Sequence, residues 1–226
     1  MQFKKIKAEM IISHSKKFVF IHHPKTAGSS IGSCLSSVCE GGDIIAGDYS
    51  RENLSVYKPS IFYQKKHAGI AEIKEMVPII SRENYFTFGF ARNPFYLAFS
   101  AFRYFKRTKP TKNWKWTSKE RFKSLQKMNF NQYINSKWYA RALTMHDTFF
   151  DSDGKPLNFI GRFEDINSDL LKIYKKIGLK EFPKTPHKNR SPLMELNLRE
   201  IYNDKSIKIV ETKNKKDLEY FNYDFA

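Results

Sequence analysis

The segment FIHHPKTAGSS, residues 20–30, combines residue types that can bind an anion. Its apolar start reads as a strand, and a helix is predicted to follow it. A strand that turns into a helix exposes several backbone N–H groups at the positive end of the helix dipole. Lys25 adds a mobile charge, and Thr26, Ser29 and Ser30 add hydroxyl donors. The segment therefore predicts a phosphate-ester site, with a purely structural turn as the alternative.

Gly28 in this segment is expected to let a ligand approach the backbone closely. The pattern of the nucleoside-triphosphate P-loop, G-x-x-x-x-G-K-[ST], does not fit, because Lys25 precedes Gly28. Phe20 and Ile21 also stand where the first glycine of that pattern would be sought. No predicted strand ends in a clear magnesium-holding Asp. A metal-dependent kinase is therefore disfavoured.

A second segment, FARNPFYLAFSAF, residues 90–102, carries another pair of phosphate-binding side chains. Arg92 ends a predicted strand, and Ser100 follows on a predicted helix, two turns in. Pro94 suits the first turn of that helix. The guanidinium and the hydroxyl could converge on one phosphate.

The elements that must position these segments alternate between strands and helices, which is typical of βα units on a parallel sheet. The predicted strands cover residues 16–21, 60–67, 85–90 and 157–164, and the predicted helices cover 29–38, 71–77, 94–105, 130–143, 166–179 and short segments from residue 198 onward. With 41% hydrophobic and 15% aromatic residues, the 226-residue chain can fill one core. We expect an α/β protein, a single domain over residues 1–226 with a central, mainly parallel sheet flanked by helices.

Residues 106–123 form a strongly basic stretch that contains Trp114 and Trp116. Early turn residues suggest a surface excursion. Aromatic stacking and positive charge suit a sugar acceptor, especially an acidic one. A solvated loop with two packing tryptophans is the alternative.

Together, HHPKTAGSS and RNPFYLAFS resemble the two nucleotide-binding elements of sulfotransferases that use 3′-phosphoadenosine 5′-phosphosulfate (PAPS), especially the carbohydrate sulfotransferase family 2 type. The segments KHAGIAEIKE, YFTFGFARNP, NFIGRFEDINSDL and IVETKNKKDLEYFNYDF also look like blocks of that family, in the expected order. The resemblance covers roughly residues 17–225. It implies a P-loop-like sulfotransferase fold, PAPS as the sulfuryl donor, 3′,5′-bisphosphoadenosine as the product, and no metal.

The resemblance also implies roles for individual residues. The residues expected to bind the 5′ side of the donor are Lys25, Thr26, Ala27, Gly28, Ser29 and Ser30. Arg92 and Ser100 are expected to bind the 3′-phosphate. The family often has an aromatic residue, an acid and an arginine directly after RNP, whereas this chain has Phe95, Tyr96 and Leu97. The chain departs from the family at these three positions, and the departure affects the packing of that helix.

Sulfuryl transfer needs a base at the acceptor and a cation at the leaving oxygen. Lys25 is the natural cation. His67 closes a predicted strand, at the edge of the sheet where ligands gather in open α/β folds. In the resembling family, a histidine in a block like KHAGIAEI matches the proposed base. A structural or substrate-orienting role is the alternative for His67, and a packed or capping role is expected for His22 and His23.

Arg162 is a further candidate for the acceptor site. It lies on a predicted strand with Glu164, from which its side chain could reach the site. Alternate strand residues share a face, so a structural ion pair between the two is the other interpretation. The histidines show no convincing zinc spacing. Cys34 and Cys39 do not make a disulfide framework.

The charge balance predicts attraction to polyanions, since 40 Lys and Arg against 23 Asp and Glu give a formal net charge of +17. The leading hypothesis is a sulfotransferase that acts on a carbohydrate hydroxyl, with an acceptor that is acidic or polymeric. The alternatives are a polyanion-binding basic module, for heparin-like chains or nucleic acid, and a kinase-like phosphotransferase. The sequence shows no nucleic-acid fold signature, so no nucleic-acid partner is expected.

No stretch approaches the roughly 18 apolar residues of a membrane span, and the N-terminus has no uninterrupted apolar run of the signal-peptide type. We therefore expect no integral membrane segment and a cytoplasmic chain. The lysine- and isoleucine-rich composition is compatible with a bacterial enzyme.

Overall fold

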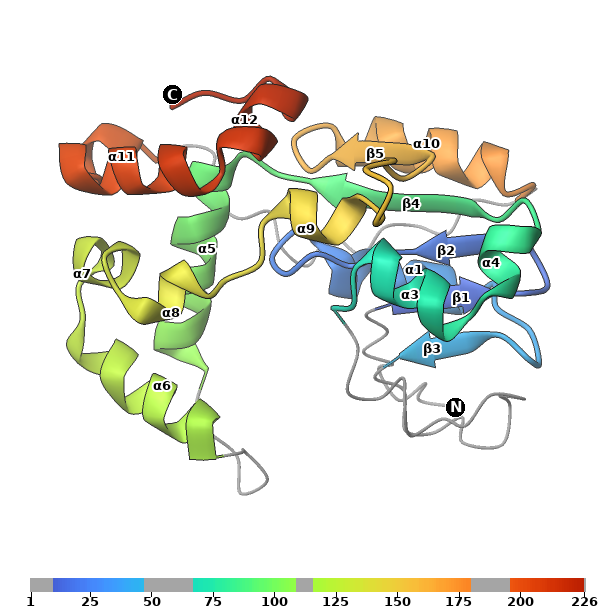
Figure 1. The fold of residues 1–226 in the computed structure, drawn as a ribbon, viewed down its shortest axis with the longest axis horizontal. Helices are drawn as coiled ribbons and strands as arrows, with labels where there is room; N and C mark the ends of the chain where they lie inside the picture. The colour runs from blue at the N-terminus through green and yellow to red at the C-terminus, as the bar shows by residue number, and fades with distance from the viewer. Residues whose placement is uncertain (1–9, 47–66, 109–115, 180–195, 226) are drawn as a thin grey trace. The chain divides into compact units, whose positions relative to one another are not determined.

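The computed structural model describes residues 10–46, 67–108, 116–179 and 196–225 (Figure 1). The chain groups into two compact units, each built from two stretches of sequence. Unit 1 combines Met1–Ala91 with Met145–Arg190, and unit 2 combines Arg92–Thr144 with Ser191–Ala226. The expectation of a single domain stays a prediction.

Unit 1 is organised around a five-stranded sheet with the strand order β3-β1-β2-β4-β5. The strands are β1 (Met10–Ser13), β2 (Phe18–Phe20), β3 (Ile44–Ala46), β4 (Phe86–Ala91) and β5 (Phe159–Arg162). The pairs β2·β4 and β4·β5 are parallel, whereas β1 is antiparallel to both of its neighbours. Only β1 therefore runs against the other strands of the described sheet, which confirms the expected α/β architecture with a mainly parallel centre.

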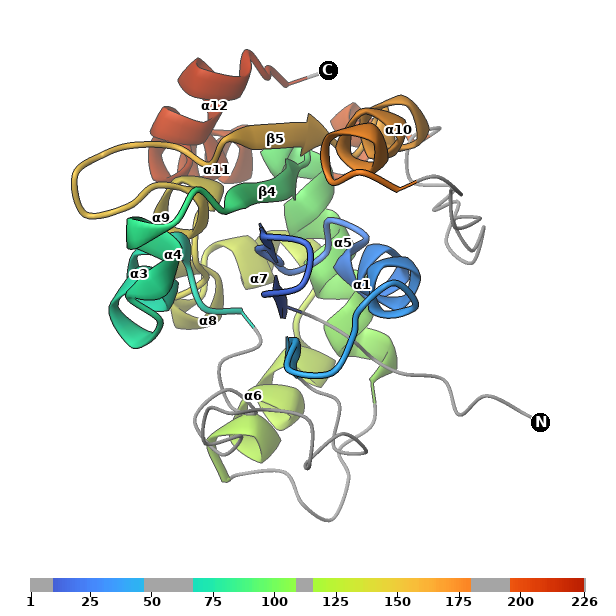
Figure 2. The same cartoon turned by 90° about the vertical axis from the view of Figure 1, so that its right-hand side faces the viewer.

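The central strands are apolar runs because helices cover both faces of the sheet. The helices of unit 1 are α1 (Gly28–Ser36), α3 (Ile70–Met76), α4 (Ile79–Arg82), α9 (Met145–Phe149) and α10 (Ile166–Lys176). Figure 2 shows α1 and α10 on one side of the sheet and α3 and α4 on the other. Phe18, Phe20 and Phe88 form the aromatic part of the core that this arrangement buries.

The predicted strand at residues 60–67 lies outside the described residues except for its last residue, His67. The other three predicted strands are confirmed as β2, β4 and β5. The short strands β1 and β3 were not predicted. They extend the sheet on the side of β2 away from β4.

Unit 2 is helical in the part that the structure describes. Its helices are α5 (Pro94–Arg107), α6 (Trp116–Lys127), α7 (Phe130–Ile134), α8 (Lys137–Ala140), the 3-10 helix η2 (Leu198–Glu200), α11 (Asp204–Lys213) and α12 (Lys215–Phe221). Its core is rich in rings, and the Tyr202 ring contacts both Phe95 and Phe130 edge to face. The part of the basic stretch 106–123 that follows residue 115 belongs to α6.

Two local features begin α5, and the sequence suggested the first of them. Pro94 occupies the first helical turn, and the side chain of Asn93 caps the helix by accepting a hydrogen bond of 3.0 Å from the backbone N–H of Phe95. None of the described helices is both long and apolar enough to cross a membrane.

Candidate active site

The loop between β2 and α1 has a strained backbone. Lys25 and Ala27 adopt left-handed conformations, with φ angles of 69° and 63°. Such conformations cost a non-glycine residue of order 1–2 kcal/mol, so the surrounding contacts must hold them. The Thr26 hydroxyl donates to the His23 carbonyl at 2.8 Å, and the Ala27 carbonyl accepts from the N–H of Ser30 at 2.9 Å. The loop is thereby fixed directly before the N-terminus of α1.

This loop has the features of an anion site. Left-handed residues turn backbone N–H groups toward one point, and the first N–H groups of α1 have no partner within the helix. The helix dipole adds positive potential there. The half-buried Lys25 and the exposed Ser29 belong to the same segment. A phosphate or sulfate group fits the chemistry of these donors.

Gly28 has a role that the sequence analysis did not predict. A Cβ atom at this position would lie 1.8 Å from Cδ2 of His22, far inside the contact distance of two carbon atoms. The imidazole of His22 therefore occupies the space that Gly28 leaves open. We expected the missing side chain to admit a ligand, but in the structure it admits the His22 ring.

His22 also contacts His67. The two rings meet edge to face with their centroids 4.8 Å apart, and Nδ1 of His67 lies 3.1 Å from the backbone carbonyl oxygen of His22. A carbonyl oxygen can only accept a hydrogen bond, so Nδ1 of His67 must carry the proton in this contact. The neutral His67 ring then presents Nε2 with its lone pair, which is the form that a general base needs.

The segment after His67 approaches α9 closely. Gly69 begins α3 as its N-cap residue, and a Cβ atom there would lie 2.8 Å from the carbonyl oxygen of Asp147. Only glycine fits this approach without a shift of the backbone. Gly69 thus helps to fix the chain two residues beyond His67.

His23 lies in a different environment from His67. Its side chain is only 2% exposed, and Nδ1 lies 2.9 Å from Oγ1 of Thr148. Burial, with a smaller contribution from His67, lowers the pKa of His23 to about 3. His23 is therefore neutral near pH 7 and too weak a base to accept a proton efficiently there. The packed role that the sequence suggested for His23 agrees with these contacts.

The second motif lies at the start of unit 2. Arg92 follows the last residue of β4 directly and is 3% exposed, and Ser100 lies in α5 and is 8% exposed. The neighbouring Asn93 donates from Nδ2 to the carbonyl oxygen of Asp224 at 2.9 Å, which ties the start of α5 to the end of the chain. Arg92 is thus held at a strand end, as the sequence predicted.

The structure brings His67, His22 and Gly28 together in unit 1. His22 and Gly28 flank the strained loop in sequence. Arg92 and Ser100 belong to unit 2. That Arg92 and Ser100 bind the same ligand as the loop residues stays a prediction.

The remaining candidates are less defined. Arg162 ends β5 half-buried, and its backbone N–H donates to Oδ2 of Asp169 at 2.8 Å. Trp114 lies outside the described residues, and Trp116 begins α6 with a side chain that is also outside them. Within the described ranges, no group of three or more His, Cys, Asp or Glu side chains could hold a metal ion.

Comparisons with known proteins identify the family of the chain. A relative from Archaeoglobus fulgidus, described only as an uncharacterized protein, is 29% identical over 106 residues, which cover 44% of this chain and 72% of the relative. No solved structure matches the chain significantly. A family model described as "Sulfotransferase family" matches residues 8–224, which is almost the whole chain. The resemblance found in the two motifs is thereby confirmed, and the chain belongs to the sulfotransferase family.

Proposed function

We propose that this protein transfers a sulfuryl group from PAPS to a hydroxyl group of a carbohydrate. Membership of the sulfotransferase family supports sulfuryl transfer in general. The observation that carries the finer proposal is the β2–α1 loop, in which Lys25 and Ala27 adopt left-handed conformations immediately before a helix N-terminus. A loop of this kind suits the phosphosulfate end of such a donor.

The loop would bind the 5′ side of the donor. The residues proposed for this role are Lys25, Thr26, Ala27, Gly28, Ser29 and Ser30. Because the Thr26 hydroxyl already donates to the His23 carbonyl, we assign its backbone N–H rather than its hydroxyl to the donor. Lys25 would stabilise the negative charge that develops on the bridging oxygen.

Arg92 and Ser100 would bind the 3′-phosphate, which distinguishes this donor from ordinary nucleotides. Both side chains are more than nine-tenths buried. A guanidinium in such surroundings makes strong, charge-assisted hydrogen bonds to a phosphate.

His67 would act as the general base. The contact of its Nδ1 with the His22 carbonyl favours the tautomer in which Nε2 is the proton-accepting nitrogen, so Nε2 would accept the proton of the acceptor hydroxyl. As that proton leaves, the acceptor oxygen forms a bond to sulfur, and the bond from sulfur to the bridging phosphate oxygen breaks. The bound donor supplies the sulfuryl group, and its product is 3′,5′-bisphosphoadenosine.

Thermal unfolding with added nucleotides tests the donor. We expect 3′,5′-bisphosphoadenosine to raise the melting temperature more than 5′-AMP does, because only the former has a 3′-phosphate. The matched variant Ser100→Ala should reduce this difference and leave the response to 5′-AMP unchanged. Equal responses of the unmodified protein to both nucleotides would refute the PAPS assignment. Magnesium-dependent ATP turnover that survives Arg92→Ala would favour a kinase-like enzyme instead.

The variant His67→Ala tests the base separately. We expect turnover to fall by roughly 10²–10⁴-fold, the usual contribution of a general base, while the thermal shift with 3′,5′-bisphosphoadenosine persists. Near-normal turnover of this variant would show that the base lies elsewhere.

A further inference from the structure

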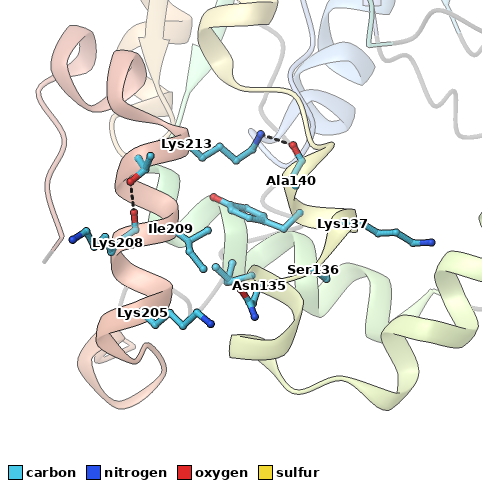
Figure 3. Close-up of a pocket in the computed structure, with 11 residues that line it drawn as sticks. Asn135, Ser136, Lys137, Ala140, Lys205, Lys208, Ile209 and Lys213 are labelled. Atoms are coloured by element: carbon cyan, nitrogen blue, oxygen red, sulfur yellow. Dashed lines mark hydrogen bonds between the residues drawn. The ribbon is translucent and has the colours of Figure 1, made fainter.

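A groove in unit 2 lies between α11 and the segment formed by α7 and α8 (Figure 3). We call it the α8–α11 groove. Its volume is about 590 Å³, which lies within the range of sites that bind small molecules or short chain segments. None of the candidate catalytic or donor-binding residues lines it. The groove therefore needs an explanation of its own.

The floor of the groove is apolar and firmly held. Ile134 is 1% exposed and Tyr139 is 4% exposed, and the half-buried Ile209 lies beside them. The Tyr139 hydroxyl accepts a hydrogen bond of 3.0 Å from Nδ2 of Asn214, and the same amide nitrogen donates to the Val210 carbonyl at 2.8 Å. These bonds fix the Tyr139 ring, so the floor is preformed.

The rims of the groove are positively charged. The lysines that line it are Lys137, Lys205, Lys208 and Lys213, and no Asp or Glu is among the lining residues in the described part of the chain. In Figure 3, Lys205 and Lys213 reach from α11 toward the α7–α8 segment, whereas Lys208 and Lys137 extend outward on opposite sides. Such an arrangement attracts an extended anion rather than a single small ion.

The contacts of the groove lysines decide how much positive charge a ligand in the groove would meet. Lys213 donates to the carbonyl oxygen of Ala140 at 3.0 Å, which is a neutral acceptor. Lys137 lies 3.3 Å from Oε1 of Glu120 at an exposed position, where an ion pair contributes little. No carboxylate within the described ranges pairs with Lys205 or Lys208. The groove therefore keeps a net positive potential.

We propose that the α8–α11 groove binds a segment of an anionic carbohydrate chain that carries carboxylate or sulfate groups. This inference rests on the proposed function, in which the acceptor is a carbohydrate, and it assigns that acceptor an anionic character and a binding surface. The C–H face of a sugar ring would pack on Ile209, and sugar hydroxyls would meet the polar side chains of Asn135 and Ser136. The acidic groups would meet Lys205, which reaches toward the α7–α8 segment, and Lys208 on the outer side of α11 would add to the positive potential.

The lining favours a carbohydrate over a nucleic acid. Single-stranded nucleic acids bind through bases stacked on exposed aromatic faces, whereas Tyr139, the only aromatic ring among the described residues that line the groove, is buried in its floor. The described lining also contains no arginine, the side chain best suited to bidentate recognition of phosphate.

Direct binding measurements test this proposal without relying on activity. The probes are a fluorescent heparin octasaccharide, a neutral maltooctaose with the same label, and a labelled single-stranded oligodeoxynucleotide. The test variant is Lys205→Glu with Lys208→Glu. The matched control is Lys175→Glu with Lys176→Glu, which makes the same change of charge at exposed positions of α10 in unit 1.

We expect the test variant to weaken heparin binding by about tenfold at 0.1 M salt and the control to weaken it much less, since the potential is local. Maltooctaose should bind weakly to all proteins. Equal losses of heparin affinity in both variants would show that only the net charge of the protein matters, and would overturn the groove assignment. Oligodeoxynucleotide binding with the same sensitivity to the test variant would overturn the choice of carbohydrate.

The same proteins should also be tested for stabilisation by 3′,5′-bisphosphoadenosine. If the nucleotide stabilises both variants but heparin binding does not distinguish them, the groove inference alone fails. If the unmodified protein does not distinguish this nucleotide from 5′-AMP, the proposed function fails. The two failures are therefore separable.

Discussion

Three histidines lie near the end of β2 and the start of α3. They have the same type of side chain but differ in role because their surroundings differ. The half-buried His67 donates from Nδ1 to a backbone carbonyl, which makes Nε2 the proton-accepting nitrogen of the neutral ring. His22 fills the space beside Gly28 with its ring. His23 is buried against Thr148. Environment rather than residue type thus separates the candidate base from the packing residues.

The burial of His23 predicts a loss of stability in mild acid. The pKa of His23 is about 3 in the folded protein and near 6.5 when the chain is unfolded, because burial disfavours the charged ring. Below pH 6.5 the unfolded state therefore binds a proton that the folded state does not. As the pH falls from below 6.5 toward 3, His23 should lower the free energy of unfolding by about 1.4 kcal/mol for each pH unit.

Urea denaturation at several pH values between 7.5 and 4.5 measures this effect. The variant His23→Gln should be less stable at pH 7.5 but should lose less stability as the pH falls. Thr148→Val is the control, since it removes the hydrogen-bond partner but keeps His23 buried, so its pH dependence should match that of the unmodified protein. His14, whose pKa burial also lowers, contributes equally to all three proteins. Parallel pH curves for His23→Gln and the unmodified protein would contradict the prediction.

At the scale of the elements, the β2–α1 connection depends on the fit between His22 and Gly28. The variant Gly28→Ala places a Cβ atom 1.8 Å from the His22 ring, so that ring or the helix must move. We expect the free energy of unfolding to fall by roughly 1–3 kcal/mol, the usual cost of overpacking. Gly41→Ala is the matched control, because a Cβ atom there meets nothing within 4 Å.

A double-variant cycle identifies the cause. In the background His22→Ala, the cost of Gly28→Ala should largely disappear, because the clashing ring is absent. Urea denaturation of the four proteins gives the coupling energy. An equal cost in both backgrounds would show that Gly28 is required for a reason other than the His22 ring.

The sequence predicted the elements whose patterns are local. The apolar runs of β2 and β4 and the proline of α5 identify those elements directly. β1 and β3 span only 4 and 3 residues; β1 joins the sheet by pairing with β2, and β3 joins it by pairing with β1. Short strands of this kind carry too little pattern to be distinguished from other apolar runs.

For the candidate site too, the sequence predicted local positions but not long-range contacts. The position of Arg92 after a strand follows from the sequence, and so does the approach of the loop to a helix N-terminus. The contact of His23 with Thr148 joins residues 125 positions apart, and the contact of His67 with a carbonyl involves no side chain of the partner. Neither contact leaves a mark in local spacing, so both required the structure.

At the scale of the whole molecule, the two units are interlaced along the chain. Each unit has its own hydrophobic core. Unit 2 closes only when its C-terminal stretch returns to its first stretch, and the Tyr202 hydroxyl marks this closure by donating to the Phe95 carbonyl at 2.8 Å. The intervening residues, Met145–Arg190, belong to unit 1. Folding of that segment shortens the flexible loop that unit 2 must close, which lowers the entropic cost.

This interlacing predicts one cooperative unfolding transition, as the expectation of a single domain requires. Differential scanning calorimetry should give one peak with equal calorimetric and van 't Hoff enthalpies. The variant Tyr202→Phe leaves the buried Phe95 carbonyl without that donor and should destabilise the protein by about 1–3 kcal/mol. Because the units unfold together, the variant should shift the whole peak to lower temperature. Two peaks, of which Tyr202→Phe moves only one, would instead mean that unit 2 unfolds independently despite its divided sequence.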